Sequence, residues 1–478
     1  MKVKIIYIHP SKYLDKPSYC VIPVGIPSIV NYLIKHLDVE VVGVNIGMEL
    51  SINSSKTLNN ILFDICNYDI VLCDLHWYEH SEGAIRVAEY IKSIKNIPVI
   101  MGGLTSTIFA EQIMVSADAI DYIIKGDGEV SLKKLIEIII DNDCSSKLQN
   151  IPGLVYRRGT TIVTNPGIGE KENLNNLDFS KIEFLRNWNY YYRTSLDGVC
   201  LDNNVLSTWI CLGKGCKYNC IYCGGNKNVH KIAYGRDRME FRDPNVVWNE
   251  ICHYMKQGVS VFKFNLDLDI LPKDISKSLL NRFNDNKYRN GIYNEFWQLP
   301  SWDLVNDIIN TCNNLLCNLI YSPVTGDEKL RYKYGKYFTN NQFIKHLERL
   351  AKEYIPVTIY FSTNLPGETD YSFEQTIELA NKIKNMFPKE LLEIYCEPHT
   401  IEPISDISLH NNKYKIKNTL KTFEDYRMYC REKDRINMLG FDNFTIEQLE
   451  KRKKRWNQCF NDGQNSRKKD FYDKWVLV

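Results

Sequence analysis

The chain has 478 residues, which is more than one ordinary hydrophobic core needs and predicts two or three domains. Hydrophobic residues make up 44% and charged residues 25%, as in a globular protein in water, and the net charge of +2 gives no general attraction to nucleic acid or membranes. The longest apolar runs are far shorter than the roughly 20 residues of a membrane span. We therefore expect a cytoplasmic protein without a signal peptide, in which most of the fifteen cysteines are free thiols and a few form a metal site.

The first 147 residues alternate strand-like and helix-like segments. Strands are expected at residues 3–10, 39–47, 69–75, 97–103 and 121–126, and helices at 25–37, 57–67, 82–94 and 129–140. This α/β alternation predicts a doubly wound, Rossmann-like parallel sheet over residues 1–147. A ligand would bind beyond the carboxyl ends of its strands, at the loops that follow Ile8, Cys73, Met101 and Lys125.

The rest of the chain is expected to form a hairpin, a barrel and a short extension. Residues 148–200 are interpreted as a hairpin and a polar linker. Within residues 201–430, six strands are expected near 205–210, 261–268, 295–300, 317–323, 357–366 and 392–403, which predicts a partial (β/α)6 TIM-like barrel. Residues 431–478 form a small C-terminal extension. We interpret its KRKKRW run as an exposed helix face, and binding to an acidic peptide or to nucleic acid is the alternative.

Three cysteines after the first barrel strand carry the clearest chemistry. Cys216, Cys220 and Cys223 have the spacing C-x3-C-x2-C, with Tyr222 before the last one. Three thiolates on one loop can bind three irons of a [4Fe–4S] cubane and leave the fourth iron open. Gly224 and Gly225 allow the backbone to approach the cluster closely.

Two other interpretations of this loop remain open. A structural zinc ion normally takes four protein ligands, and no second Cys or His pair at zinc-finger spacing follows nearby. Cys211, five residues before Cys216, could supply a fourth ligand. It would then close the cluster and restrict it to electron transfer.

The triplet with Tyr222 resembles the signature of the radical S-adenosylmethionine (SAM) superfamily, and residues 204–410 are similar to that family's partial barrel. The resemblance implies a cluster that cleaves SAM reductively to a 5′-deoxyadenosyl radical. It also implies an external electron donor of the flavodoxin or ferredoxin type. Val324 and Thr325 stand where relatives tend to carry a Glu-Ser pair, so the glutamate is absent. The implied SAM-binding residues are Tyr222, Gly224, Gly225, Asn265, Asp267, Ser322, Thr325, Asn364, Pro366 and Glu402.

The N-terminal domain resembles the cobalamin (B12)-binding domain that precedes the barrel in B12-dependent radical SAM enzymes. Asp74-Leu75-His76 is similar to a cobalt-ligating D-x-H-x-x-G motif, but it follows the third strand and has Glu79 at the glycine position. We therefore expect a cobalt without a histidine ligand, and a corrin face lined by Asp74–Trp77. The implied cobalamin-binding residues are His9, Pro10, Tyr13, Asp74, Leu75, His76, Gly102, Gly103, Thr105, Gly126, Asp127, Gly128 and Glu129.

A further group of residues follows the cysteine loop. His230, Tyr234, Arg236 and Arg238 are interpreted either as a site for a substrate carboxylate or phosphate, through an arginine fork, or as a solvated loop.

Together these features predict a cobalamin-dependent radical SAM enzyme, most simply a methyltransferase that acts on an unactivated carbon of a small molecule or peptide. The resemblance implies that methylcobalamin donates the methyl group and that a second SAM restores it. Three alternatives remain: a B12-dependent rearrangement or cyclisation, a fold that has lost cobalamin, and a non-enzymatic Fe–S/B12 sensor with Cys211 as fourth ligand.

Overall fold

The computed structural model describes residues 2–17, 20–141, 147–193, 205–286, 289–416, 420–431 and 445–460. These residues form two compact units. Unit 1 holds the described residues within 2–193, 227–238 and 420–431, and unit 2 holds those within 205–226, 239–416 and 445–460. Two segments that we expected inside the barrel, α8 (Lys227–Tyr234) and α17 (Phe423–Arg431), therefore belong to unit 1.

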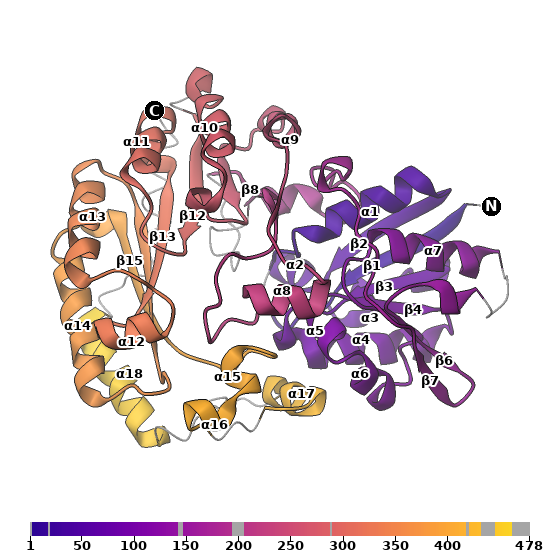
Figure 1. Ribbon diagram of the computed structural model, residues 1–478. Helices are drawn as coiled ribbons and strands as arrows, with labels where there is room; N and C mark the ends of the chain where they lie inside the picture. The colour runs from indigo at the N-terminus through magenta and orange to yellow at the C-terminus, as the bar shows by residue number, and fades with distance from the viewer. Residues whose placement is uncertain are drawn as a thin grey trace. The chain divides into compact units, whose positions relative to one another are not determined.

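Unit 1 is built on a seven-stranded sheet with the order β2-β1-β3-β4-β5-β6-β7 (Figure 1). Its first five strands are parallel, and the hairpin β6–β7 continues the sheet by antiparallel pairing with β5. The hairpin that we expected between the domains is thus part of the first sheet. The strands are β1 (Val3–His9), β2 (Val39–Asn45), β3 (Ile70–Asp74), β4 (Val99–Gly102), β5 (Tyr122–Ile124), β6 (Leu154–Arg158) and β7 (Thr161–Thr164).

The order of these strands makes the sheet doubly wound. The chain moves from β1 to β2 in one direction and from β3 to β5 in the other, so right-handed crossovers place helices on both faces. The helices of unit 1 are α1 (Gly25–His36), α2 (Ile46–Ile52), α3 (Leu58–Ile61), α4 (Ser81–Ile94), α5 (Leu104–Ile108), α6 (Ala110–Ser116), α7 (Glu129–Ile140), α8 (Lys227–Tyr234) and α17 (Phe423–Arg431). The α/β class and the doubly wound order expected from the sequence are confirmed.

Unit 2 contains a six-stranded, all-parallel sheet with the order β15-β14-β13-β12-β11-β8, the strand set of a partial barrel (Figure 1). A two-stranded ribbon, β9–β10, follows β8. The strands are β8 (Ser207–Ile210), β9 (Gly213–Lys214), β10 (Glu240–Phe241), β11 (Val261–Phe264), β12 (Gly291–Phe296), β13 (Asn318–Val324), β14 (Val357–Thr363) and β15 (Leu392–Pro398). The partial barrel is confirmed, although its third strand begins four residues before the expected start at 295.

Helices pack on one face of this sheet. The rings of Phe262 and Phe283 lie 5.6 Å apart, and those of Tyr321 and Phe343 5.8 Å apart. The helices of unit 2 are α9 (Pro244–Lys256), α10 (Lys273–Asn281), α11 (Trp302–Thr311), α12 (Glu328–Lys333), α13 (Asn340–Lys352), α14 (Asp370–Lys384), α15 (Asp406–Leu409), α16 (Asn411–Tyr414) and α18 (Ile446–Phe460). Among the described residues, no helix has the length and apolar character of a bilayer-spanning segment.

Candidate functional site

The cysteine loop lies directly after β9 in unit 2. The thiols of Cys216, Cys220 and Cys223 are half-buried. The Cys216 Sγ accepts the Tyr218 N–H at 3.4 Å, and the Cys223 Sγ accepts the Gly225 N–H at 3.3 Å. Peptide N–H donors of this kind stabilise negative charge on the cysteine sulfurs of Fe–S clusters. Three thiols on one loop, two of them facing N–H donors, therefore fit a cluster that carries a cysteine on each of three irons.

Burial governs the protonation of these thiols in the metal-free chain. It raises the pKa of all three, against the opposing effect of the nearby N–H donors and of Lys336. No three Cys, His, Asp or Glu side chains among the described residues form a group that could hold a single metal ion. A bound cluster would supply the positive charge that keeps the three sulfurs deprotonated.

Cys211 is engaged away from the loop. Its side chain is buried, and its thiol donates to the Gly213 carbonyl at 3.7 Å. The Arg242 guanidinium donates to the Cys211 carbonyl at 2.9 Å and pairs with Glu250, which fixes this stretch of backbone. Burial raises the pKa of Cys211 to about 11. These contacts fit a structural thiol better than a fourth cluster ligand.

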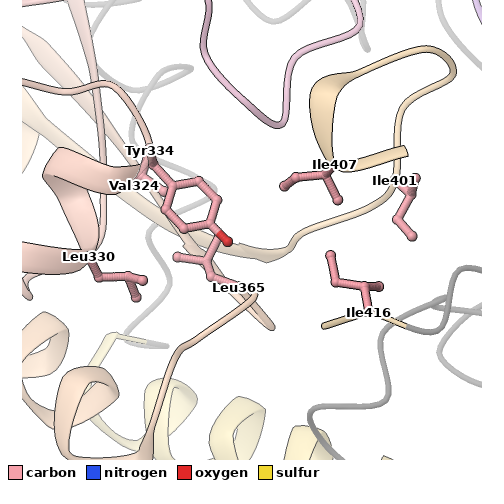
Figure 2. Packing of buried hydrophobic residues seen from close by; sticks show 7 residues of the cluster. All are labelled: Val324, Leu330, Tyr334, Leu365, Ile401, Ile407 and Ile416. Carbon is pink, nitrogen blue, oxygen red and sulfur yellow. The ribbon is translucent and has the colours of Figure 1, made fainter. Parts of the chain in front are cut away.

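An apolar cluster gathers the carboxyl ends of the last three barrel strands beside the cysteine loop (Figure 2). The Tyr222 ring packs against it, 5.8 Å from the Tyr334 ring and 5.1 Å from the His399 ring. The Ile407 N–H donates to the Ile221 carbonyl at 3.0 Å. Strand ends that are far apart in sequence are thereby held beside Tyr222. The cluster consists of Val324, Leu330, Tyr334, Leu365, Ile401, Ile407 and Ile416.

Besides Tyr222, three SAM-binding candidates lie in this loop or contact it: Gly224, Gly225 and Glu402. The Gly224 N–H donates to Glu402 Oε2 at 2.7 Å, and a Cβ at position 224 would lie 2.6 Å from the same oxygen. Gly224 is thus required by the close approach of Glu402. At Gly225 the nearest atom to an added Cβ would be the Cys223 sulfur at 3.8 Å, so the backbone there leaves room for a ligand.

Four other candidates bind the protein itself. Asn265 holds the turn before the cysteine loop, because it accepts from Leu212 N at 2.8 Å and donates to the Gly213 carbonyl at 2.9 Å. Asp267 accepts the N–H groups of Asp269 and Trp297, both at 2.8 Å, and burial raises its pKa to about 7. Thr325 Oγ1 lies 3.1 Å from Thr376 Oγ1, and the Pro366 carbonyl accepts the Tyr334 hydroxyl. For these residues the structure shows scaffolding contacts.

A glutamate that the sequence analysis missed lies next to Ser322. The Ser322 hydroxyl donates to Glu295 Oε1 at 2.8 Å, from β13 to the neighbouring strand β12. The parallel register pairs Glu295 with Ile320, two residues before Ser322, so both side chains point to the same face of the sheet. Glu295 could not be recognised from the residues at the end of β13, because it lies on the adjacent strand β12.

Backbone strain is concentrated at the ends of three strands. Three residues other than glycine have a positive φ there: Val324, the last residue of β13 (69°), Asn364 after β14 (62°) and Ile404 beyond β15 (50°). Such conformations are costly for β-branched side chains and are typical of functional sites. Asn364 is wholly buried, and neither its amide nitrogen nor its amide oxygen has a hydrogen-bond partner among the described residues. A buried amide without partners indicates a site for a polar ligand.

In unit 1, the loops expected to form the second site do converge. His9 Nδ1, at the last residue of β1, lies 2.8 Å from Asp74 Oδ1, at the last residue of β3. The Thr105 hydroxyl, after β4, donates to the His76 carbonyl at 2.9 Å. The Gly126 N–H, after β5, donates to Thr107 Oγ1 at 2.9 Å. Hydrogen bonds thus connect the carboxyl ends of β1, β3, β4 and β5.

Several side chains of these loops are buried and pack inside unit 1. His9 and Leu75 are fully buried and Pro10 is also buried, and their contact with cobalamin stays a prediction. Asp74 also accepts the Tyr7 hydroxyl at 2.6 Å. Buried polar atoms of His9 (Nε2) and Asp74 (Oδ2) have no partner among the described residues. Tyr13 and His76 remain partly exposed and can face a ligand.

The glycines of this edge differ in what surrounds them. A Cβ at Gly102 would meet only the Ile124 carbonyl at 3.9 Å, whereas at Gly103 (φ 110°) it would lie 2.8 Å from the backbone of Leu75 and His76. At Gly126 it would lie 2.0 Å from Ile168. Only Gly102 of these three leaves open space that a side chain would fill, and that space fits close approach by a large cofactor.

The side chains of the Gly126–Glu129 loop contact other residues of unit 1. Asp127 forms a buried ion pair with Arg236 (2.6 Å), and the Ser28 hydroxyl donates to Glu129 at 3.1 Å. The Gly128 position is approached by the side chain of Ile29. Arg236 was expected either to bind a substrate anion or to be solvated. The expectation of a solvated arginine is wrong, because this buried guanidinium pairs with Asp127 and holds the segment after α8 against the loop, while binding of a substrate anion stays a prediction.

Comparison with known proteins gives a family match for part of unit 1 and two curated relatives. Residues 10–136 match the family model of the B12 binding domain. A tRNA-2-methylthio-N(6)-dimethylallyladenosine synthase of Petrotoga mobilis is 26% identical over 37% of this chain and 41% of its own. An uncharacterized methyltransferase of Pyrococcus horikoshii is 25% identical over 63% of this chain and 61% of its own. The chain therefore matches less than two thirds of either relative.

Two solved structures share the fold over most of the chain. The radical SAM methyltransferase TsrM of Kitasatospora setae, with cobalamin and a [4Fe–4S] cluster bound, matches with a TM-score of 0.59 and 15% identity, over 83% of this chain and 72% of that one. The cobalamin-dependent SAM radical enzyme OxsB matches with a TM-score of 0.56 and 12% identity, over 96% and 62%. The resemblance to the B12-dependent radical SAM fold is confirmed.

Proposed function

We propose that this chain is a cobalamin-dependent radical SAM methyltransferase that methylates an unactivated carbon of a small molecule or peptide in the cytoplasm. The supporting observation is the three-cysteine loop at the strand ends of a partial barrel, together with Cys211, five residues before the loop's first cysteine, whose thiol donates to Gly213. A cubane held by three cysteines keeps an iron open for SAM. The matched B12 binding domain supports cobalamin as the second cofactor.

In this proposal the residues of unit 2 bind and orient SAM. Cys216, Cys220 and Cys223 hold the cluster, and Tyr222 fixes the loop against the apolar cluster of Figure 2. The buried Asn364 amide offers both a donor and an acceptor to SAM. The bound cluster and cobalamin would supply the electron for SAM cleavage and the methyl group for transfer.

The residues of unit 1 would hold cobalamin at the edge where β1, β3, β4 and β5 end. Gly102 leaves room for close approach, and Tyr13 and His76, in the loops after β1 and β3, are partly exposed. The remaining residues expected there, including Asp127 and Glu129, stiffen the loops. Two of the similar proteins are methyltransferases by name, which favours methyl transfer over rearrangement.

The proposal is tested by anaerobic reconstitution with iron, sulfide and cobalamin, followed by turnover with SAM labelled in its methyl group. A methyltransferase yields labelled product with 5′-deoxyadenosine and S-adenosylhomocysteine in comparable amounts. Product without label and without S-adenosylhomocysteine would assign the enzyme to the rearrangement class.

A further inference from the structure

The helix α18 packs into unit 2 along one face. Its residues Leu449, Arg452, Trp456 and Phe460 are buried and follow one another at helical spacing. The Trp456 ring lies 6.0 Å from the Phe361 ring on β14. The expectation that the KRKKRW run is an exposed face is therefore wrong for Arg452 and Trp456.

The Arg452 guanidinium forms ion pairs with the turn that follows β14. Its Nη1 lies 2.5 Å from Glu368 Oε2, and its Nη2 lies 2.8 Å from Asp370 Oδ1. The guanidinium also lies 5.2 Å from the centre of the Phe373 ring. The Glu368 side chain is 0% exposed, and a carboxylate buried to this extent needs a counter-charge. Arg452 provides it.

Glu368 in turn holds the strained end of β14. Its Oε2 accepts the Asn364 N–H at 2.8 Å and the Thr363 hydroxyl at 3.2 Å. Asn364 has a φ of 62°, a left-handed conformation that asparagine adopts more readily than other residues with a side chain, and the Glu368 carboxylate holds its N–H there. The same residue presents the buried, unpartnered amide. A line of direct contacts thus runs from α18 through Glu368 to Asn364.

We propose that Arg452 is a positioning residue for SAM: through Glu368 it fixes the backbone of Asn364 and so orients the amide that binds this cosubstrate. The inference deepens the proposed function and depends on it, because the ligand is SAM. It makes the C-terminal helix part of the SAM site. Full affinity for SAM would then require α18 in addition to the barrel strands and the cysteine loop.

A dependence of SAM binding on the charge of Glu368 would distinguish a positioning role of Arg452 from a merely structural one. Burial raises the pKa of Glu368 to about 7, although Arg452 and the hydrogen bonds to Glu368 lower it. Its charged or titratable neighbours are Arg452, Asp370, Lys333 beside Gly367, the Tyr334 phenol and the Cys396 thiol. Burial raises the pKa of Tyr334 and Cys396 far above neutrality. Because this pKa lies near 7 with Arg452 in place, removal of Arg452 would raise it further, so that Glu368 holds its proton and loses its charge-assisted hydrogen bonds over more of the range above pH 7.

The experiment measures SAM binding by calorimetry to the anaerobically reconstituted full chain, without reductant, between pH 6.5 and 9. We expect Arg452→Ala to bind SAM about tenfold more weakly at pH 7, which corresponds to about 1.4 kcal/mol. The loss should shrink toward pH 9 as Glu368 ionises. Arg452→Lys should recover part of the affinity, and Glu368→Gln should remove the pH dependence. Arg455→Ala is the matched control, since Arg455 pairs with Glu374 at the surface of the same helix.

Iron content and the melting temperature of each variant separate positioning from folding. Wild-type affinity and an unchanged pH profile in Arg452→Ala would overturn the inference while the proposed function stands. A loss of SAM affinity in Arg452→Ala that is equal at every pH and accompanied by a fall in melting temperature would also overturn the inference. If Arg452→Ala does not fold, Arg452→Lys and Glu368→Gln decide by the same pH profile. A wild-type chain that carries its cluster but binds no SAM would contradict the proposed function, and the inference with it.

Discussion

Gly224 and Glu402 are 178 residues apart in sequence, yet the Gly224 N–H donates to Glu402 Oε2 at 2.7 Å. Glu402 lies on the segment that follows β15, and its carboxylate reaches the cysteine loop. The Ser405 hydroxyl donates to the Glu402 carbonyl at 2.8 Å and holds this segment in a turn. A side chain larger than hydrogen at position 224 would collide with this carboxylate. The last barrel strand thereby fixes the loop that follows the first.

Removing this carboxylate should loosen the cysteine loop. A hydrogen bond to a charged group contributes about 1.5–3 kcal/mol. We expect Glu402→Ala to lower the iron bound per chain after reconstitution, and Glu402→Gln to retain most of it because its amide oxygen still accepts. Glu397→Gln, on the exposed end of β15, is the control. Equal iron content in Glu402→Ala and wild type would show that the bond does not support the cluster.

The position of Cys211 predicts a sharp contrast among the cysteines. Its buried thiol donates to Gly213 at 3.7 Å, so Cys211→Ala should keep the cluster absorbance and nearly all of the iron. Replacing Cys216, Cys220 or Cys223 by Ala should abolish both. Loss of the cluster in Cys211→Ala, in a chain that still melts cooperatively, would instead make Cys211 a ligand.

Gly102 and Gly103 should respond differently to substitution. Space around Gly102 lets a side chain enter the edge where we place cobalamin. Gly102→Val should reduce cobalamin uptake, measured by its absorbance after gel filtration, while the free energy of unfolding changes by less than about 1 kcal/mol. Gly103→Ala should destabilise the chain by about 1–3 kcal/mol, because of its positive φ and the nearby backbone of Leu75. Full cobalamin uptake by Gly102→Val would remove this edge from the site.

Asp74 should contribute stability that acid removes. Burial pushes its pKa upward, but interactions with His9 and Tyr7 outweigh burial and hold the pKa below its usual range. A carboxylate with a lowered pKa stabilises the fold above the unfolded pKa of about 3.9, and this stability is lost as the pH falls through the lower, folded value. Asp74→Asn should thus cost about 1–3 kcal/mol at pH 7, and progressively less below about pH 4.

Thermal unfolding at several pH values measures this effect on the metal-free chain. Asp118→Asn serves as the control, since the Asp118 side chain is 99% exposed. A difference between Asp74→Asn and wild type that grows on acidification would have the wrong sign for the contacts described.

The strand pattern predicted both sheets because parallel strands buried on two faces are short apolar runs, such as Ile70–Asp74. The docking of α8 and α17 onto unit 1 was not predicted. It depends on long-range contacts, such as Arg427 with Glu82 at 2.7 Å, that no local pattern announces. In α18 a signal was present: Leu449, Arg452, Trp456 and Phe460 repeat at three to four residues, but the surrounding lysines obscured it.

The candidate site was predicted best where a motif fixes chemistry and least where a side chain has two possible uses. The cysteine spacing directly identified the loop. Asn265 and Asp127 matched the expected positions, yet both bind the protein itself, through the Gly213 carbonyl and Arg236. Whether a polar side chain faces a ligand or its own backbone depends on rotamers and neighbouring loops, which a single sequence does not encode locally.

The central claim is tested most directly by the 5′-deoxyadenosine formed when the anaerobically reconstituted chain is reduced in the presence of SAM. Chromatography with mass detection should find this nucleoside in wild type and in Cys211→Ala, in a protein that carries about four irons. None should form when Cys216, Cys220 or Cys223 is replaced by Ala. A fully loaded wild-type cluster that leaves SAM intact under reduction would contradict the account.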